Sequence, residues 1–515
     1  MATNIQGNMK YKGRLNLLPS ANAPLPKGAN LFADFAGGRH VIKHASGNVL
    51  RSSILTDILS FSRDSTATRI AESGLLEYLQ ANEPAIDYHP MTGECLGLRV
   101  ERSTWNRLEW SQDFSKIATW AASGVVLTPG ATQAPDGNMT ATKLIEATDT
   151  QAAVRKLVAT TTAEATKDFP YSFSIFAKAN TASVLQLSAV GAFPEPTFVN
   201  FDLKNGRLGK TSSGSTKRGL MQATIEPYRN GWYRCSITIM PYSAANPEFT
   251  LALTESDTSA GALPSYLPAT PKSVFIWGAQ AELSDGATSY IPTIGAEVQR
   301  GSDICTTPTV ASFVSAAAGT VLVSVVHPHS IKALTDKYGA LSCAAVIDNS
   351  VAGPHVRFAY RNTNVDGDYG AVLGVVPDES GTAQNLEIPS MPPVPDSEQA
   401  CIFSFDATAL TARLFDGYNW YERSLTATPP ALNRLTIGRG YLESSNYLKG
   451  YIKKNRLLAF CAERISDGRN ALSLRCGENG ETILYATDRR RRAKAGRGRG
   501  FRCAGKYHPD GGRGW

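Results

Sequence analysis

Hydrophobic and polar positions alternate with period two along most of the chain, in short segments closed by glycine, proline and other turn residues. Residues 231–239 and 274–282 show this best, because aromatic and β-branched side chains fill alternate positions there. Successive side chains of a β-strand point to opposite faces of a sheet, so this period indicates strands. We predict an all-β protein of antiparallel sheets, with Trp232 and Trp277 in its core.

The predicted strands form two groups, separated near residues 306–308. The first group includes residues 142–145, 171–178, 184–187, 198–203, 231–239 and 274–282. Asn205-Gly206 is a hairpin signal within it. The second group includes residues 319–326, 355–360, 401–406, 411–415, 434–438 and 450–452. Each group has enough strands for two facing sheets, so the fold class is tandem antiparallel β-sandwiches.

The first group carries three motifs in order. They are G-W-Y-R-x-S at residues 231–236, I-W-G-A-Q-x-E at 276–282 and S-Y-I-P-T at 289–293. Together they resemble the carbohydrate-binding-module-like jelly roll of bacteriophage tail-fibre and head-spike proteins.

The residues before the jelly roll resemble a module that often precedes it in such proteins. They contain S-R-x-S-x-A-T at 62–68, I-D-Y at 86–88 and G-L-x-x-E at 97–101. Two positions depart from the pattern. Ala85 stands where an arginine is usual, which removes any ion pair that the arginine would make, and Trp105 intrudes just before Asn106.

The second group resembles the laminin-G and concanavalin-like sandwich, over roughly residues 310–470. The resemblance rests on I-G-R-G at 437–440 and on the segment L-x-G-Y-I that ends at residue 452. The predicted parts of the chain are an N-terminal arm (1–30), a short-stranded β module (31–109), a jelly roll (110–305), a concanavalin or laminin-G-like sandwich (306–470) and a basic tail (471–515).

The net charge of +7 is concentrated in the tail. Residues 475–515 contain eleven Lys/Arg and four Asp/Glu, which leaves 41 basic and 41 acidic side chains in the rest of the chain. The neutral body gives no support for nucleic-acid binding. We expect the tail to be disordered, because arginine and glycine without hydrophobic periodicity cannot bury a core. Its two interpretations are binding to nucleic acid or another acidic surface, and an extension without a role.

Targeting and redox signals are absent from the sequence. There is no run of about 20 apolar residues that predicts a membrane span, and no apolar segment of secretory type at the start. The eight cysteines lie far apart and form no C-x-x-C pair. We therefore expect reduced thiols in a protein that folds in a cytosol, with no membrane insertion.

No catalytic signature is present, because the sequence lacks a G-x-S-x-G elbow, an H-E-x-x-H motif and a P-loop. His327 and His329 could offer two metal ligands, but no third is apparent nearby. We expect no enzyme activity, no cofactor and no metal. The 45 acidic residues leave a hydrolytic carboxylate pair open as an alternative.

Candidate glycan contacts are aromatic residues beside predicted turns, because sugars present flat apolar C–H faces that stack on Trp or Tyr while polar neighbours bind the hydroxyls. Two clusters fit: Tyr418, Asn419, Trp420 and Tyr421, and Tyr360, Arg361, Asn362 and Asn364. An interchain interface and a solvated loop are the alternatives for each cluster.

The resemblance implies a structural virion protein of a tailed bacteriophage: a tail fibre, a head spike or a decoration protein. It further implies a homotrimer that binds bacterial surface polysaccharide and is assembled into the virion in the host cytoplasm. The N-terminal arm would contact other virion proteins, although a disordered terminus is the alternative. A polysaccharide-degrading spike (depolymerase) and a purely structural capsid or tail decoration protein remain alternative functions.

Overall fold

The computed structural model describes most of residues 29–488. The described residues are 29–43, 47–161, 163–193, 197–212, 219–307, 318–326, 342–348, 354–362, 369–376, 382–388, 398–415, 420–428, 432–440, 447–448, 451–452, 459–460, 470–476 and 482–488. They form antiparallel β-strands with two short 3₁₀ turns, η1 (Leu55–Asp57) and η2 (Arg229–Gly231). The predicted all-β class is confirmed. None of the helices in this described set is long and apolar enough to cross a membrane.

The chain divides into two compact units. One comprises residues 28–461, and the other comprises residues 1–27 and 462–515. The described part of the second unit is an antiparallel pair, β37 (Asn470–Cys476) and β38 (Thr482–Asp488). A tail without structure from residue 471 was expected, but alternating β-prone residues form this antiparallel pair. The arginine-rich residues 489–515 lie outside the described residues.

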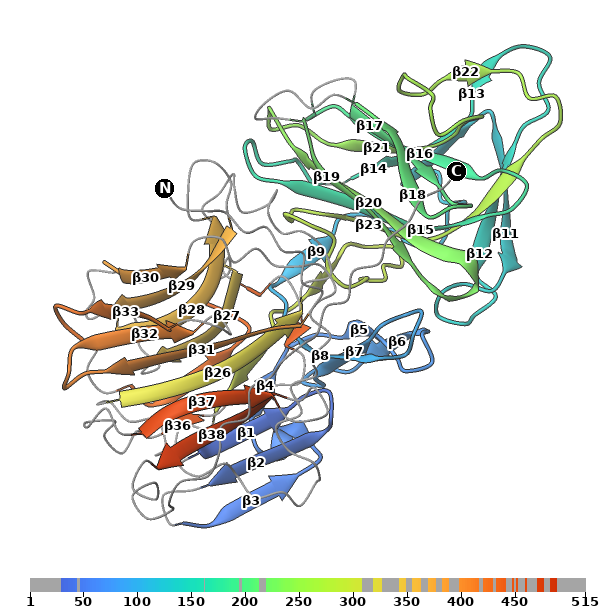
Figure 1. Cartoon of the computed structure of the whole chain (residues 1–515). Coiled ribbons are helices and arrows are strands. Elements are labelled where there is room, and N and C mark those ends of the chain that lie inside the picture. Colours follow the sequence, from blue (N-terminus) through green and yellow to red (C-terminus); the bar gives the residue numbers. More distant parts are fainter. Residues whose placement is uncertain are drawn as a thin grey trace, which may run out of the picture. The chain divides into compact units, whose positions relative to one another are not determined.

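The jelly roll consists of two six-stranded sheets (Figure 1). The first sheet has the order β11 (Val125–Thr132), β12 (Ala141–Glu146), β23 (Ser273–Glu282), β15 (Tyr171–Ala179), β20 (Trp232–Met240) and β19 (Gly219–Pro227). The second sheet has the order β10 (Trp120–Ser123), β14 (Lys156–Thr160), β21 (Glu248–Leu253), β16 (Val184–Val190), β17 (Thr197–Asp202) and β18 (Arg207–Thr211). The predicted hairpin at Asn205-Gly206 joins β17 and β18.

The core of the jelly roll lies between these sheets and follows the alternation of the sequence. Phe173 of β15 stacks on Phe249 of β21, with ring centroids 4.6 Å apart. Ile237 and Leu251 are fully buried in the same cluster. Aromatic and β-branched side chains therefore fill the inner faces, as period-two patterning predicts.

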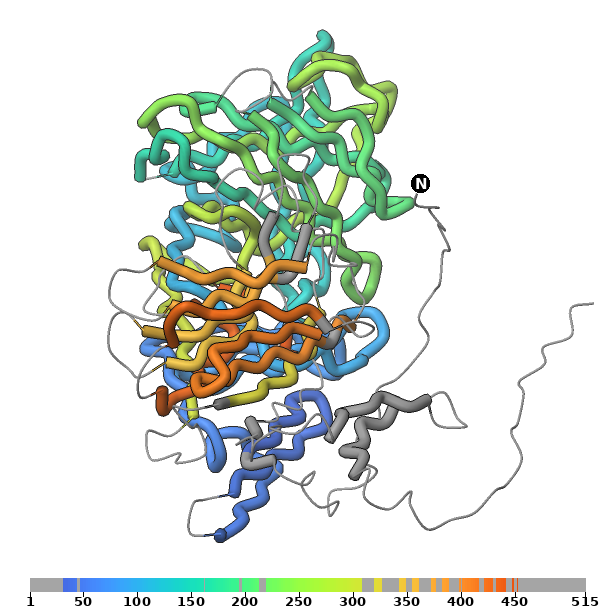
Figure 2. Tube along the Cα trace, turned by 60° about the vertical axis from the view of Figure 1, so that its left-hand side comes forward, coloured from blue at the N-terminus to red at the C-terminus, as the bar shows by residue number. Residues whose placement is uncertain are grey.

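The second sandwich has one sheet of eleven strands and one of seven. The larger sheet runs β3 (Val49–Ser52), β2 (Arg39–Lys43), β1 (Ala29–Asp34), β36 (Ala459–Phe460), β26 (Ala318–Val326), β31 (Glu398–Asp406), β32 (Thr411–Phe415) and β33 (Trp420–Ser424), with β35 (Tyr451–Ile452), β8 (Cys95–Arg99) and β7 (Ala85–Tyr88) attached through β26. The smaller runs β30 (Gln384–Ile388), β29 (Tyr369–Val376), β28 (His355–Asn362), β27 (Ser342–Asp348), β34 (Arg434–Ile437), β25 (Ile304–Thr306) and β4 (Ser60–Ser62). Strands β26 and β31–β33 run side by side in Figure 2.

Strands from the beginning of the chain complete this second sandwich. β1 pairs with β36, and β4 pairs with β25, next to β34. One buried core contains Leu31 and Phe61 from these early strands together with Phe403. The jelly roll is thus an insertion within the sandwich, which differs from the predicted boundaries at residues 31 and 306. Sequence patterns of single strands do not reveal which distant strand is the partner.

Three two-stranded sheets complete the described fold. They are β5 (Ala67–Ile70) with β6 (Leu76–Leu79), β9 (Thr104–Asn106) with β24 (Val298–Arg300), and β13 (Ala153–Val154) with β22 (Ser265–Tyr266). β9 directly precedes the jelly roll in the chain and β24 directly follows it. The ribbon therefore contains both the segment that enters the jelly roll and the segment that leaves it. No disulfide joins Cys95, Cys235, Cys305, Cys343 or Cys401.

Candidate functional site

The motif residues of the resemblance meet in one buried junction, where the chain enters and leaves the jelly roll. Arg63 Nη1 donates to Asp303 Oδ1 at 3.0 Å. Thr68 Oγ1 donates to the carbonyl of Tyr290 at 2.7 Å. These pairs join residues more than 200 positions apart in the sequence. The motifs therefore mark a shared structural unit rather than separate strands.

Asn106 is the central hydrogen-bonding residue of this junction. Its Nδ2 donates to the carbonyls of Ala279 at 3.0 Å and Ile291 at 2.8 Å. Its Oδ1 accepts from the backbone N–H of Ala281 at 3.1 Å. Gln280 Oε1 accepts from the N–H of Ile291 at 2.6 Å. Because Asn106 is fully buried, these bonds satisfy polar groups that would otherwise destabilise the fold.

A chain of charged residues runs through the same junction. Glu101 accepts hydrogen bonds from the N–H and the Oγ of Ser289, at 2.8 and 2.6 Å. Its Oε2 lies 3.1 Å from Arg99 Nε and 3.6 Å from Arg300 Nη1. Burial alone would raise the pKa of Glu101, but Arg300, Arg99 and the Ser289 hydrogen bonds hold it at about 2. This carboxylate therefore stays charged and bound to its partners.

At Asp87, in contrast to Glu101, burial has a larger effect on the pKa than the neighbouring arginine and the hydrogen bond. The Asp87 Oδ2 lies 2.5 Å from Arg99 Nη1, and its Oδ1 accepts from the N–H of Ile70 at 2.8 Å. Burial nevertheless raises the pKa of Asp87 to about 6, because desolvation outweighs these contacts. Burial likewise raises the pKa of Asp303. Since the arginines engage these acids, the junction holds strands together and presents no open pair of carboxylates.

The aromatic motif residues pack beside this junction. Trp232 and Trp277 are 1% and 0% exposed, which confirms their predicted place in the core. They share a buried cluster with Phe176 and Tyr290, to which Ile70 of the β5–β6 hairpin also belongs. The indole N–H of Trp277 donates to Thr140 Oγ1 at 3.0 Å, and that of Trp232 donates to the carbonyl of Gln133 at 3.1 Å. Neither indole is available to a glycan.

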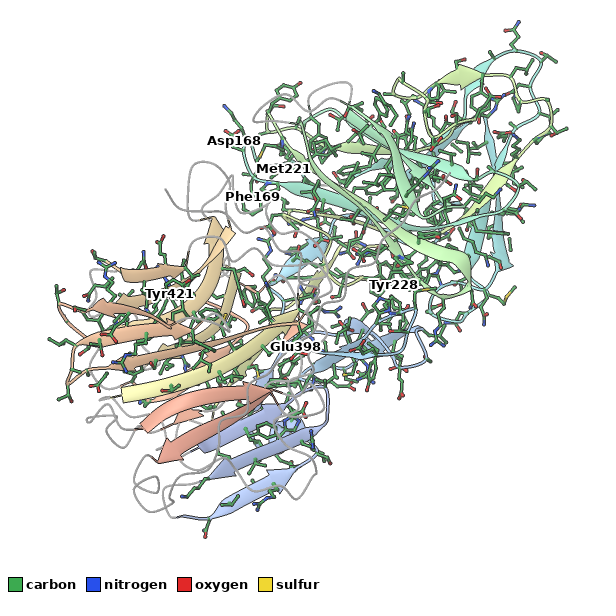
Figure 3. All side chains as sticks on the ribbon, viewed as in Figure 1. Asp168, Phe169, Met221, Tyr228, Glu398 and Tyr421 are labelled. Atoms are coloured by element: carbon green, nitrogen blue, oxygen red, sulfur yellow. The ribbon has the colours of Figure 1, made fainter. Side chains whose placement is uncertain are left out.

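The first cluster of predicted glycan contacts is only partly described. Tyr421 is half-buried on the edge strand β33 and packs against the core of the second sandwich (Figure 3). Trp420 begins this strand, but its side chain lies outside the described residues, as do Tyr418 and Asn419 altogether. The predictions for these four residues stay predictions.

Tyr360, in the second cluster, lies in the core instead of at the surface. It is fully buried on β28, where its ring makes an edge contact with Phe358 at 5.3 Å. Val356, Phe358 and Tyr360 share one face of the strand, so alternation carries Tyr360 inward. It therefore cannot contact a glycan in this structure. Arg361 and Asn362 end β28 with side chains outside the described residues, which also exclude Asn364.

A candidate site that the sequence did not single out lies on the β9–β24 ribbon. Trp105 is 36% exposed and pairs across the ribbon with Gln299. Alternation places Ser103 and Arg107 on the same face as Trp105, and Glu297 next to Gln299. These five residues form what we call the ribbon face. The sequence did contain one indication of this site, the unusual Trp105 just before Asn106. Because side chains alternate along β9, Trp105 points away from the face on which Thr104 and Asn106 are buried.

Hydrogen bonds and ring contacts organise the ribbon face. Gln299 Nε2 donates to Ser103 Oγ at 2.8 Å. Arg107 Nη1 bonds to Glu297 Oε2, and the guanidinium lies 4.9 Å from the centroid of the Trp105 ring. An aromatic ring beside amide, hydroxyl, carboxylate and guanidinium groups can stack on an apolar sugar face and bind its hydroxyls.

The outer face of the second jelly-roll sheet is covered by the chain itself. Gln186 and Asn200 are buried there and bonded to each other at 2.8 Å. Asn200 Nδ2 donates to the carbonyls of Asp257 and Ser259, at 3.1 and 3.0 Å. Gln186 Oε1 accepts from the N–H of Leu263 at 2.6 Å. The loop that contains residues 257–263 thus covers the polar side chains of Gln186 and Asn200 on the outer face of this sheet.

Metal binding has no support in the described part of the chain. Those residues contain no group of three or more His, Cys, Asp and Glu that could hold an ion. The histidines at 327 and 329 lie outside the described residues.

Comparisons with known proteins find similarity at the level of solved structures only. No protein-family model matches the chain, and no curated protein matches it. The CBM40 of Ruminococcus gnavus IT-sialidase is 10% identical with a TM-score of 0.19, covering 28% of this chain and 73% of its own. Domains LG4-5 of the mouse laminin alpha1 chain are 8% identical with a TM-score of 0.19, covering 66% and 89%. The LG1-3 region of the laminin alpha2 chain is 10% identical with a TM-score of 0.18, covering 60% and 64%. At these TM-scores the likenesses carry no argument about ligands.

Proposed function

We propose that this chain is a non-enzymatic structural protein of a tailed bacteriophage particle, a fibre, spike or decoration protein, whose β-sandwiches bind glycans of the bacterial surface. The observation that carries the proposal is the buried junction. Motifs typical of phage fibre and spike proteins, spread over residues 62–293, contribute Arg63, Glu101 and Ser289 to one hydrogen-bonded unit, in which Asp303 accepts from both Arg63 and the N–H of Glu101. Motif matches that arose by chance would not be expected to converge in this way.

The mechanism that we propose is multivalent attachment by weak sites. A shallow site on a sheet surface binds a sugar weakly, because few atoms are desolvated and ordered. Several copies on one particle raise the effective concentration and so the avidity. A homotrimer anchored to other virion proteins through the N-terminal arm would supply such copies.

The test is binding of the full chain to purified bacterial surface polysaccharides and to whole cells. Reproducible preference for some polysaccharides would support the proposal, and no binding to any of them would overturn its adhesion part. Release of new reducing ends during the assay would instead favour the depolymerase. Electron microscopy of the intact particle, with an antibody against the chain, tests the virion assignment: an unlabelled particle would contradict it.

A further inference from the structure

We infer that the ribbon face of β9 and β24 is a glycan site, and that its ligand is a single uncharged pyranose unit of a surface polysaccharide. This inference rests on the proposed glycan-binding function and specifies where and what the chain binds. Its starting point is the combination of an exposed indole with four polar side chains on one face of two short strands.

The indole is held on a rigid support. Its neighbours along the strand, Thr104 and Asn106, are 5% and 0% exposed. The Asn106 amide bonds to two carbonyls of the jelly roll, so β9 cannot shift without breaking buried hydrogen bonds. The Arg107 guanidinium over the Trp105 ring further fixes its orientation. A preorganised aromatic platform loses little entropy when a sugar stacks on it.

The polar groups around the indole suit hydroxyl groups. Gln299 offers a carbonyl and an amide, and Ser103 offers a hydroxyl already linked to it at 2.8 Å. Directly opposed residues of an antiparallel pair have Cβ atoms about 4.5–5.5 Å apart. The Cβ atoms of Trp105 and Gln299, which are directly opposed across the ribbon, are thus separated by about the width of one pyranose ring. Neighbouring hydroxyls on that ring could then hydrogen-bond to the amide of Gln299 and the hydroxyl of Ser103 at the same time.

The charges of the ribbon face select against an acidic sugar. Its single cation, Arg107, is paired with its single anion, Glu297, and their side chains are 22% and 20% exposed. A carboxylate or sulfate on the ligand would compete with Glu297 for the Arg107 guanidinium. It would also be repelled by the negative charge of Glu297. An uncharged sugar can accept from Arg107 and donate to Glu297 without breaking the pair. Binding is therefore expected to depend little on ionic strength.

The experiment is saturation-transfer difference NMR on the full chain, a method that detects weak ligands of large proteins. The probes are methyl β-glucopyranoside, methyl β-N-acetylglucosaminide, methyl β-galactopyranoside and methyl β-glucuronide. We expect transfer to the ring C–H protons of at least one neutral probe, unchanged between low and high salt, and weaker transfer to the glucuronide. Trp105→Ala is expected to weaken binding about tenfold, which corresponds to the loss of one aromatic stacking surface.

Two further variants make the result specific. Gln299→Ala removes a polar contact and is expected to weaken binding while leaving the indole in place. Tyr242→Ala removes an aromatic side chain that is 46% exposed on another loop, and it should bind as the wild type does. Glucuronide binding stronger than that of every neutral probe, or equal binding by wild type and Trp105→Ala, would overturn the inference.

Failure of this inference can be told apart from failure of the proposed function. If Trp105→Ala still binds surface polysaccharide and cells as the wild type does, the glycan site lies elsewhere and only the ribbon-face assignment falls. If the wild-type chain binds neither polysaccharides nor monosaccharide probes, both fall together.

Discussion

Replacing Arg63 with methionine is expected to destabilise the junction by about 3–5 kcal/mol, the usual cost of breaking a buried ion pair. The Arg63 side chain is 0% exposed. Its Nε donates to the carbonyl of Ser65 at 3.0 Å, and its Nη2 donates to those of Gln80 and Glu83 at 2.8 and 2.9 Å. Methionine fills similar volume but supplies none of these donors. It also removes the ion pair to Asp303 Oδ1, so that among the described residues this carboxylate keeps only its Oδ2 contacts with the N–H of Glu101 and with Arg300.

The measurement is hydrogen exchange of the full chain, followed by mass spectrometry, because a chain with several domains does not unfold in one step. Peptides that cover β4, β5 and residues 298–306 should lose protection, while those from β16 and β21 should keep it. Arg69→Met is the matched control, since Arg69 and its partner Glu77 are 27% and 47% exposed. Such a pair contributes about 0–1 kcal/mol. Equal protection in the two variants would refute the role that we assign to the buried network.

Three further changes test other parts of the structure. Because the pKa of Asp87 is about 6 in the fold, above its ordinary 3.8, the stability that this group contributes is present below about pH 4 and lost as pH rises through 6; Asp87→Asn should remove this dependence from the hydrogen-exchange protection of β7 and β8. Gly278→Ala should lower the hydrogen-exchange protection of β23, because Gly278 has φ of 61° and an added Cβ would lie 3.1 Å from the ring of Phe176, whereas Gly261→Ala meets nothing within 4 Å and should leave protection unchanged. Tyr360→Phe should leave glycan binding unchanged, because the side chain is buried, while Tyr360→Ala should lower the free energy of opening of β28, measured by hydrogen exchange, by about 3–5 kcal/mol. A binding loss in the phenylalanine variant would contradict its place in the core.

The sequence predicted many of the strands, because side-chain alternation is local, but it did not predict β27 or β29. Trp232 and Trp277 were assigned to the core on period two alone, and both are buried. The same reasoning would have placed Tyr360 inside with Phe358, because both lie on one face of the strand predicted over residues 355–360. We expected a glycan contact at Tyr360 because it stands beside a predicted turn. The strand continues to Asn362, an extension that depends on tertiary pairing.

Strand partners and the candidate site required the structure. Nothing in the residues of β1 indicates that its partner is β36, because backbone hydrogen bonds are the same for every sequence. The ribbon face combines Trp105 with Gln299, which are nearly 200 positions apart in the chain. Patterns within one segment can place the indole outward, but they do not show which polar groups surround it.

The pairing of β1 with β36 has a consequence for synthesis on the ribosome. Ala29 of β1 pairs with Phe460 of β36, so β1 cannot form this pairing until about 430 further residues have been synthesised. At roughly 5–20 residues per second this delay is on the order of tens of seconds. The jelly roll has all its strands available well before then and can fold first. During the interval the early strands expose unpaired edges, which are sites of aggregation, and overproduction at lower temperature or with chaperones should raise the yield of folded protein.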